Sequence, residues 1–130
     1  MKKTLLVVDD ELSIRLLLEH FLGDEYNVVT KDDGQKAFDW ILTGNQPDLI
    51  LADIEMPVLN GFELLDKIRT DNKMKEIPYL VVTGKGKSEN YLKSFRHGAS
   101  DYLQKPFSPE ELKTRVHGIL NKTLPVAGSE

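Results

Sequence analysis

The chain has 130 residues, enough for one domain with a substantial core but too few for two, and its 40% hydrophobic and 29% charged residues are typical of globular proteins. Its net charge of −4 leaves no basic surplus to neutralise phosphates, which argues against nucleic acid as a direct partner. The absence of cysteine excludes disulfides, thiolate metal sites and cysteine nucleophiles.

No apolar run is long enough to form a membrane span or the core of a signal peptide. The first run, Leu5–Val8, is short and breaks at Asp9 and Asp10. Lack of cysteine suits a reducing compartment. We therefore expect a cytoplasmic protein with no membrane partner.

Short apolar runs that alternate with segments of helical periodicity predict the secondary structure. The strands are expected at Leu5–Val8, Tyr26–Thr30, Leu49–Ala52, Ile77–Val82 and Ser100–Gln104. The helices are expected from Leu12 to Gly23, from Asp33 to Gly44, from Gly61 past Ile68, from Ser88 to Gly98, and from Ser108 to Leu120. This alternation predicts an α/β fold in which a parallel sheet lies between helices.

Polar side chains follow four of the five predicted strands. Asp9 and Asp10 come after the first strand, Asp53 after the third, Thr83 ends the fourth, and Lys105 follows the fifth. The carboxyl ends of parallel strands meet at one edge of the sheet, where open α/β sheets collect their ligands. Three carboxylates there repel one another, so we expect a hard cation such as Mg²⁺ among them. The lysine and the hydroxyl suit the oxygens of a phosphoryl group.

Each of these residues alone has a simpler interpretation. Asp53 could merely begin a turn. The stretch Asp9-Asp10-Glu11 could simply cap the first helix and favour its dipole. Thr83 and Lys105 are ordinary at a strand end and at a surface turn. Compatible groups at the ends of four separate strands favour a functional site.

The chain, over roughly residues 3 to 122, resembles the receiver domain of bacterial two-component response regulators. Three motifs carry this resemblance. They are Val7-Val8-Asp9-Asp10-Glu11, the stretch Asp53-Ile54-Glu55-Met56-Pro57 with Gly61, and Thr83 with the stretch Gly98 to Phe107. The resemblance implies a doubly wound, flavodoxin-like (βα)5 sheet with strand order 2-1-3-4-5. We expect the receiver domain to span residues 1–122, and residues 123–130 to be a C-terminal tail or the start of a linker.

The resemblance also implies the chemistry of the site. Asp53 would accept a phosphoryl group from a sensor histidine kinase or a histidine phosphotransfer protein. Asp10 and Asp53 would hold Mg²⁺ directly, Asp9 through water, and Glu55 through its backbone carbonyl. Lys105 would bind the phosphoryl oxygens, next to a Lys-Pro bond that can be cis.

The same resemblance implies a switch. Thr83 would move toward the phosphoryl group and Tyr102 would rotate inward, because the added negative charge biases a bistable loop and ring. The changed surface would be that of the fourth helix, fifth strand and fifth helix. This surface would control a partner protein or a fused effector domain, and could form a homodimer on phosphorylation.

Two charged residues flank the predicted site. Glu55 and Lys85 stand two residues after Asp53 and Thr83. We hypothesise that they pair across the entrance and slow hydrolysis of the phosphoryl group, which makes them modulators of its lifetime. An unchanged lifetime after replacement of either by Ala would contradict this.

Two other classes of protein have a related chemistry or fold. A magnesium-dependent phosphohydrolase that forms an aspartyl-phosphate would use a second carboxylate where Glu55 stands, but it needs a substrate cap that so short a chain lacks. A flavin carrier would need a hydroxyl- and glycine-rich loop where Asp9 to Glu11 stand, and these carboxylates repel phosphate. We therefore expect a regulatory phosphoacceptor that catalyses only its own phosphorylation and dephosphorylation, and not an enzyme with a substrate to turn over.

Overall fold

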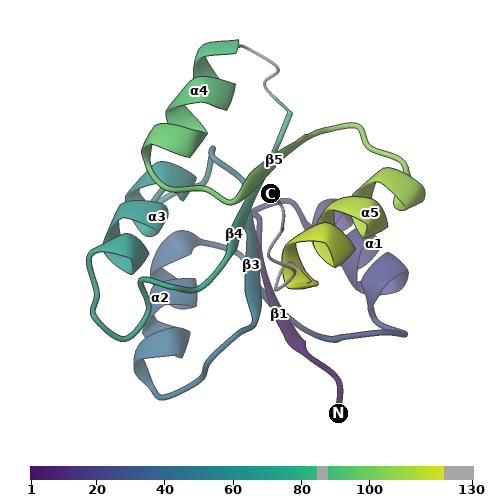
Figure 1. The fold of residues 1–130 in the computed structure, drawn as a ribbon, viewed down its shortest axis with the longest axis horizontal. Helices are drawn as coiled ribbons and strands as arrows, with labels where there is room; N and C mark the ends of the chain where they lie inside the picture. The colour runs from purple at the N-terminus through teal and green to yellow at the C-terminus, as the bar shows by residue number, and fades with distance from the viewer. Residues whose placement is uncertain (85–87, 122–130) are drawn as a thin grey trace, which may run out of the picture.

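The computed structural model describes residues 1–84 and 88–121, which form a five-stranded parallel sheet flanked by helices (Figure 1). The strands are β1 (Thr4–Val8), β2 (Asn27–Lys31), β3 (Leu49–Ala52), β4 (Tyr79–Thr83) and β5 (Asp101–Gln104). The helices are α1 (Leu12–Leu22), α2 (Gly34–Leu42), α3 (Gly61–Arg69), α4 (Ser88–Arg96) and α5 (Pro109–Leu120). The strand order β2-β1-β3-β4-β5 confirms the expected doubly wound fold. The predicted tail or linker at residues 123–130 lies outside the described residues.

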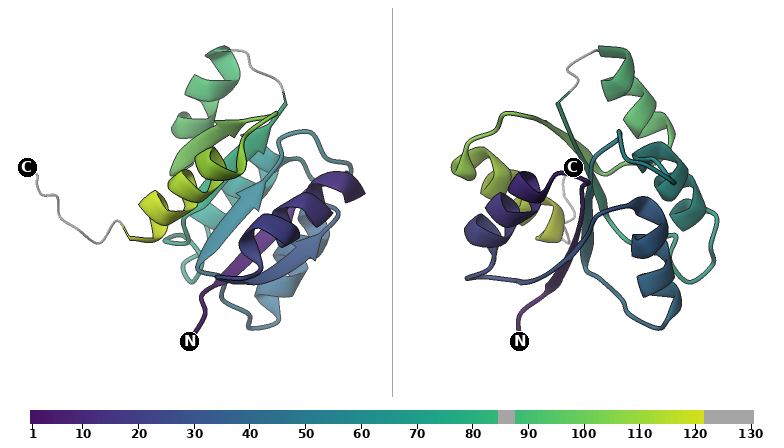
Figure 2. Two further views of the ribbon diagram at one scale, coloured as in Figure 1. Left: turned by 90° about the vertical axis from the view of Figure 1, so that its right-hand side faces the viewer. Right: turned by 180° about the vertical axis from the view of Figure 1, so that it is seen from behind.

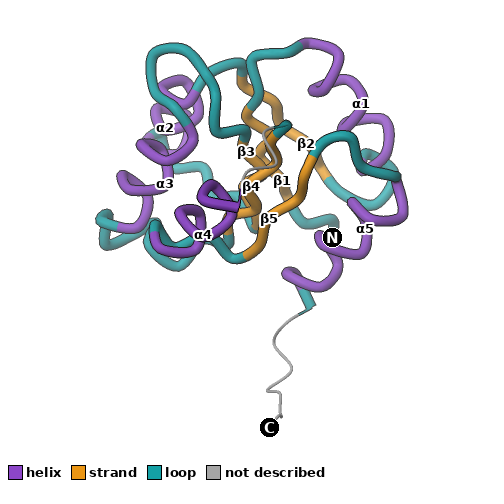
Figure 3. Tube along the Cα trace, turned by 90° about the horizontal axis from the view of Figure 1, so that it is seen from above, coloured by secondary structure: helices purple, strands orange, loops and turns teal. Residues whose placement is uncertain are grey.

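The sheet separates two apolar cores. Helices α1 and α5 cover one face, and α2, α3 and α4 lie on the other (Figures 2 and 3). Successive side chains of a strand point to opposite faces, so Leu5 and Val7 of β1 join the core under α1 and α5, while Leu6 and Val8 join the core under α2 and α3. Burial on both faces explains why the central strands are continuous apolar runs.

Side-chain caps set the starts of three helices. Asp33 and Ser108 each accept a hydrogen bond from the backbone N–H three residues on, at 2.8 and 3.0 Å, which confirms their predicted position at the helix start. Helix α3 begins with a capping box, in which Asn60 and Glu63 bond each other's backbone N–H groups.

The start of β4 differs from its prediction by two residues. Pro78 has no N–H to donate to a neighbouring strand, and the N–H of Ile77 donates to the Met74 carbonyl at 2.9 Å. Ile77 therefore belongs to the preceding turn. The Pro78 carbonyl accepts the N–H of Ile50 of β3 at 3.0 Å, and the strand itself begins at Tyr79.

Trp40, the only tryptophan of the chain, lies near the end of α2. Its side chain is half-buried and packs against the core under α2 and α3. Its carbonyl accepts hydrogen bonds from the side chains of Thr43 and Asn45, at 2.7 and 2.8 Å. These bonds close the carboxyl end of the helix.

Helix α4 exposes its large apolar side chains. Tyr91, Leu92 and Phe95 are 49%, 52% and 39% exposed. The ring of Tyr91 contacts Phe95 on its own helix and Tyr102 on β5, both edge-on. The apolar face of α4 is therefore directed partly to solvent.

Within residues 1–84 and 88–121, every helix is too short or too polar to span a membrane.

The loop between β3 and α3 contains a strained residue. Val58 has a φ of +70°, and the N–H of Leu59 donates to the Pro57 carbonyl at 2.7 Å. A hydrogen bond across three residues with a positive φ at the centre is the γ-turn that is rare and strained, and a β-branched residue is poorly suited to it. The Val58 side chain is exposed, whereas Leu59 is buried against Gly34. The buried neighbour thus holds Val58 in this conformation.

Replacement of Val58 by Gly should stabilise the fold. Removal of the strain stabilises the folded state by about 1–3 kcal/mol. The greater freedom of glycine in the unfolded chain lowers the free energy of unfolding by about 0.5–1 kcal/mol. We expect the free energy of unfolding, measured in urea, to rise by about 1 kcal/mol. Val58→Ala keeps the Cβ atom and should give no comparable gain. A loss of stability in Val58→Gly would show that Val58 is not strained.

Candidate functional site

The pairing of the two central strands brings two aspartates side by side. Val8 and Ala52 are partners in the parallel ladder between β1 and β3, and the N–H of Asp53 donates to the Val8 carbonyl at 3.0 Å. Asp9 and Asp53 therefore follow adjacent strands at the same level of the sheet.

Three carboxylates gather at this edge. Asp9, Asp10 and Asp53 each offer an oxygen, and these oxygens all lie within 4.8 Å of one another. Asp9 and Asp53 are only 2% and 7% exposed, whereas Asp10 faces solvent. One Asp53 oxygen accepts the N–H of Ile54 at 2.7 Å. The predicted convergence of these three residues is present in the fold.

Lys105 lies among the carboxylates. Its Nζ atom is 2.8 Å from Asp9 Oδ2, 3.4 Å from Asp53 Oδ2 and 3.4 Å from Glu11 Oε1. Its backbone N–H donates to the Thr83 carbonyl at 2.8 Å, so the pairing of β4 with β5 directs the lysine to this edge. The Lys105-Pro106 bond is cis, as the resemblance implied.

The electrostatic balance of the cluster is incomplete. Burial raises the pKa of Asp53, the charge of Lys105 opposes this rise, and the charge of Asp9 adds to it. Burial by itself lowers the pKa of Lys105, but its hydrogen bond to Asp9 and the surrounding carboxylates outweigh burial and raise it. Lys105 thus stays charged, and its single charge does not compensate the buried carboxylates.

The donor set suits a hard divalent cation. Carboxylate oxygens from three side chains, one of them open to solvent, are the ligands that Mg²⁺ takes together with water. A cation would also stabilise the ionised form of Asp53, whose pKa is raised mainly by burial and further by the charge of Asp9. The Asp9-Asp10-Asp53 cluster therefore fits the expected metal in its chemistry.

The simpler interpretation of the first acidic motif is not supported. Glu11 occupies the cap position of α1, but among the described residues its side chain makes no capping hydrogen bond. Asp9 Oδ1 instead accepts the N–H of Glu11 at 2.9 Å, and Arg15 donates to the Asp9 carbonyl at 2.7 Å. The contacts of Glu11 with Lys105 and of Arg15 with Asp9 were not predicted. The sequence signal that could have found Glu11 and Arg15 is their position at the start of α1, directly after the acidic end of β1.

The residues of the predicted switch lie on neighbouring strands. Thr83 is buried at the carboxyl end of β4, and Tyr102 is buried in β5 opposite Val81. Burial raises the pKa of Tyr102. The ring of Tyr102 meets that of Tyr91 at 5.5 Å between centroids, which connects β5 with the exposed face of α4.

The predicted modulators are only partly covered by the structure. Glu55 is exposed after β3, close in sequence to Asp53. Lys85 lies outside the described residues, so the pairing of these two side chains stays a prediction.

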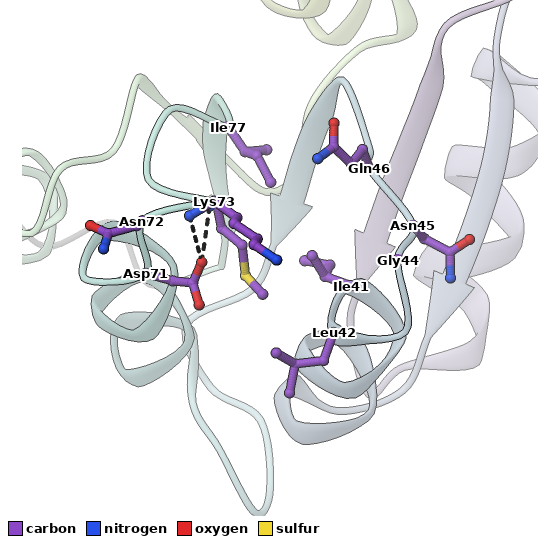
Figure 4. Close-up of a pocket in the computed structure, with 10 residues that line it drawn as sticks. Ile41, Leu42, Gly44, Asn45, Gln46, Asp71, Asn72, Lys73 and Ile77 are labelled. Carbon is purple, nitrogen blue, oxygen red and sulfur yellow. Dashed lines mark hydrogen bonds between the residues drawn. The ribbon is translucent and has the colours of Figure 1, made fainter.

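A pocket of about 400 Å³ lies at the opposite edge of the sheet (Figure 4). It is lined by the end of α2, the segment before β3 and the segment before β4, including Ile41, Leu42, Asp71, Met74 and Ile77. These segments precede strands, whereas the carboxylates follow them. The pocket is therefore separate from the acidic cluster.

The fold and the cluster define a doubly wound α/β domain with three carboxylates and a lysine at the carboxyl edge of its sheet. The family model of the response regulator receiver domain matches residues 5–117, so the chain belongs to this family.

Known proteins agree with this membership. The chain is 40% identical over 95% of its length to the alkaline phosphatase synthesis transcriptional regulatory protein PhoP of Bacillus subtilis, covering 50% of that protein. It is 36% identical over 95% of its length to the phosphate regulon transcriptional regulatory protein PhoB of Pseudomonas aeruginosa, covering 54%. The structure of the chemotaxis protein CheY4 of Vibrio cholerae superposes with a TM-score of 0.86 at 34% identity, covering 92% of this chain and 100% of that one. The chain spans about half the length of the curated relatives it matches.

Membership of this family bears on the classes of protein considered above. Receiver domains of response regulators are generally regulatory domains of phosphorylation-dependent signalling and not classical enzymes. The phosphohydrolase and the flavin carrier are therefore disfavoured.

Replacement of Asp53 by Asn should stabilise the metal-free protein at neutral pH. Because the folded-state pKa of Asp53 is raised, its stabilising contribution is complete below the unfolded-state pKa and is lost as the pH rises through the folded-state pKa. The ionised carboxylate thus destabilises the fold at pH 7, and the neutral amide avoids this cost. We expect a higher melting temperature for Asp53→Asn in EDTA at pH 7, with a smaller gain near pH 4.5.

The matched control is Asp24→Asn, which removes an exposed carboxylate just after α1 and should leave the melting temperature unchanged. A lower melting temperature of Asp53→Asn at pH 7 without metal would contradict the raised pKa of Asp53.

Proposed function

We propose that Asp53 is the phosphoacceptor of a signalling receiver domain and takes its phosphoryl group from a histidine kinase or a phosphotransfer protein. The observation that carries this proposal is the convergence of three carboxylates and Lys105 at one edge of the sheet. A buried, incompletely compensated carboxylate beside a lysine suits phosphoryl transfer, which depends mainly on positioning and charge stabilisation.

In this proposal, a carboxylate oxygen of Asp53 forms a bond to phosphorus as the bond between phosphorus and the donor histidine nitrogen breaks. The imidazole nitrogen keeps the electron pair of that bond. Lys105, now paired with Asp9 at 2.8 Å, binds the oxygens of the incoming phosphoryl group. When bound by Asp10 and Asp53 directly, by Asp9 through water and by the Glu55 carbonyl, Mg²⁺ would neutralise charge on the phosphoryl oxygens.

We further propose that the phosphoryl group switches the α4-β5-α5 surface through Thr83 and Tyr102. The buried Thr83 ends the strand next to Lys105, and Tyr102 contacts Tyr91 of α4. A movement of Thr83 with rotation of the Tyr102 ring would change how α4 packs. The exposed apolar face of α4 supports its use as a binding surface.

The output would be a partner protein or a fused effector domain. PhoP and PhoB are transcriptional regulatory proteins about twice as long as the matched part, which supports an effector in a longer form of this protein. In our proposal the receiver domain occupies residues 1–122 and residues 123–130 are a tail or the start of a linker. The domain itself would act in the cytoplasm, without direct contact to nucleic acid or membrane.

Incubation with Mg²⁺ and acetyl phosphate, followed by intact mass measurement, tests the phosphoacceptor. Wild-type protein should gain one phosphoryl group. Asp53→Asn should gain none, because an amide has no carboxylate oxygen to form the acyl phosphate, and Asp9, the other buried carboxylate beside Lys105, is paired with this lysine at 2.8 Å. If the Glu55 hypothesis is right, Glu55→Ala should lose the group faster than wild type after the donor is removed.

Glu76→Ala is the matched control for Glu55→Ala, since it removes an exposed carboxylate from the segment before β4, at the other edge of the sheet, and should leave the lifetime unchanged. A wild-type protein that binds Mg²⁺ but gains no mass with any phosphodonor would refute the receiver mechanism. Turnover of phosphate esters would instead favour the phosphohydrolase.

If phosphorylation produces a homodimer through α4-β5-α5, Phe95→Glu should prevent it, since it places a charge within the apolar face of α4. Sedimentation of the phosphorylated protein should show a dimer for wild type and a monomer for Phe95→Glu. Leu42→Glu, at an exposed position of α2, should still dimerise. Fully phosphorylated wild type that sediments as a monomer would exclude the homodimer.

A further inference from the structure

Tyr79 carries a hydroxyl group that the proposed mechanism does not use. It is fully buried at the start of β4, in the core under α2 and α3. Its hydroxyl donates a hydrogen bond to the Gly61 carbonyl at 2.8 Å. Burial raises the pKa of Tyr79 strongly, so the phenol keeps its proton. A buried phenol needs a partner, and here the partner is the first residue of α3.

Gly61 packs closely against the backbone of the proposed phosphoacceptor, Asp53, and of Ile54. Its N–H donates to the Ile54 carbonyl at 2.8 Å. A Cβ atom on Gly61 would lie 2.2 Å from the Asp53 carbonyl oxygen and 2.8 Å from Ile54 Cα. Only glycine permits this approach, which closes the loop of residues 54–61 against the end of β3.

The backbone of Tyr79 is fixed by two hydrogen bonds with Ser100. Its N–H donates to Ser100 Oγ at 3.1 Å, and its carbonyl accepts the N–H of Ser100 at 2.8 Å. The side chain of Tyr79 thus connects the start of β4 with the start of α3. The loop between Asp53 and Gly61 begins at the end of β3 and ends at the residue whose carbonyl accepts this hydroxyl.

We propose that Tyr79 is a positioning residue for the acidic site. Its hydroxyl fixes Gly61, and Gly61 in turn fixes the backbone of Asp53 and of the following residues, including the Glu55 carbonyl. Through this backbone contact the hydroxyl sets the affinity of the carboxylates for Mg²⁺. This role rests on the proposed function of the site. If Tyr79 were only a packing residue, its ring would matter and its hydroxyl would affect overall stability alone.

Tyr79→Phe keeps the ring and removes the hydroxyl. Tyr26→Phe is the matched control, because it makes the same change at a buried tyrosine in the core under α1 and α5. Backbone hydrogen exchange of residues 54–61 is measured in the metal-free proteins. Mg²⁺ affinity is measured from the Mg²⁺ concentration that gives half of the full rise in melting temperature.

In Tyr79→Phe we expect faster exchange in residues 54–61 than in the rest of the protein, and about threefold to tenfold more Mg²⁺ for half saturation. This factor lies below the roughly tenfold to hundredfold effect of groups bonded directly to metal ligands, because the Tyr79 hydroxyl acts through Gly61. Tyr26→Phe should change neither quantity. The proposal is overturned if Tyr79→Phe lowers only the melting temperature, with exchange and Mg²⁺ affinity equal to those of Tyr26→Phe.

The exchange measurement needs neither metal nor phosphoryl group. A wild-type protein that takes no phosphoryl group would refute the receiver mechanism but leave the exchange difference of Tyr79→Phe intact. Equal exchange in both variants would refute the role of Tyr79 while leaving phosphorylation of Asp53 intact.

Discussion

Repulsion between carboxylates at the carboxyl edge of the sheet is the constraint on which the site depends. Parallel pairing of β1 with β3 places Asp9 and Asp53 side by side, with Asp10 close by. Such proximity of like charges is costly in a buried setting and persists only because packing elsewhere holds the strands. Lys105, delivered by β5, offsets part of this cost. The remaining excess of negative charge favours a cation at this edge.

The two cores explain why this arrangement can persist. Each central strand is buried on both faces, so its position is fixed from two sides at once. The charged residues begin where the apolar runs stop, and their backbone is held by the strand pairing itself. Packing and charge therefore occupy separate parts of the chain: the apolar bodies of β1, β3 and β5 pack, and the residues that follow them form the charged cluster.

Much of the fold followed from local pattern, because apolar runs and helical periodicity are written in consecutive residues. The convergence of Asp9, Asp53 and Lys105 followed from topology, since parallel strands share one carboxyl edge. Contacts between segments far apart in the sequence could not be predicted. The N–H of Tyr26 closes a turn with Leu22 and does not begin a strand, and no sequence signal linked the hydroxyl of Tyr79 to Gly61. Periodicity also could not show that the apolar face of α4 would be partly exposed, because it does not identify what covers a face.

The single tryptophan provides a fluorescence signal that reports on folding and not on the acidic cluster. Trp40 lies near the end of α2 that leads into the segment before β3, beside the pocket edge of the sheet and away from the edge that carries the carboxylates. Its half-buried indole packs on the core under α2 and α3. Its fluorescence should therefore follow the unfolding of that core with little direct response to a metal or phosphoryl group at Asp53. Fluorescence and mass measurements on one sample would then separate folding from site chemistry.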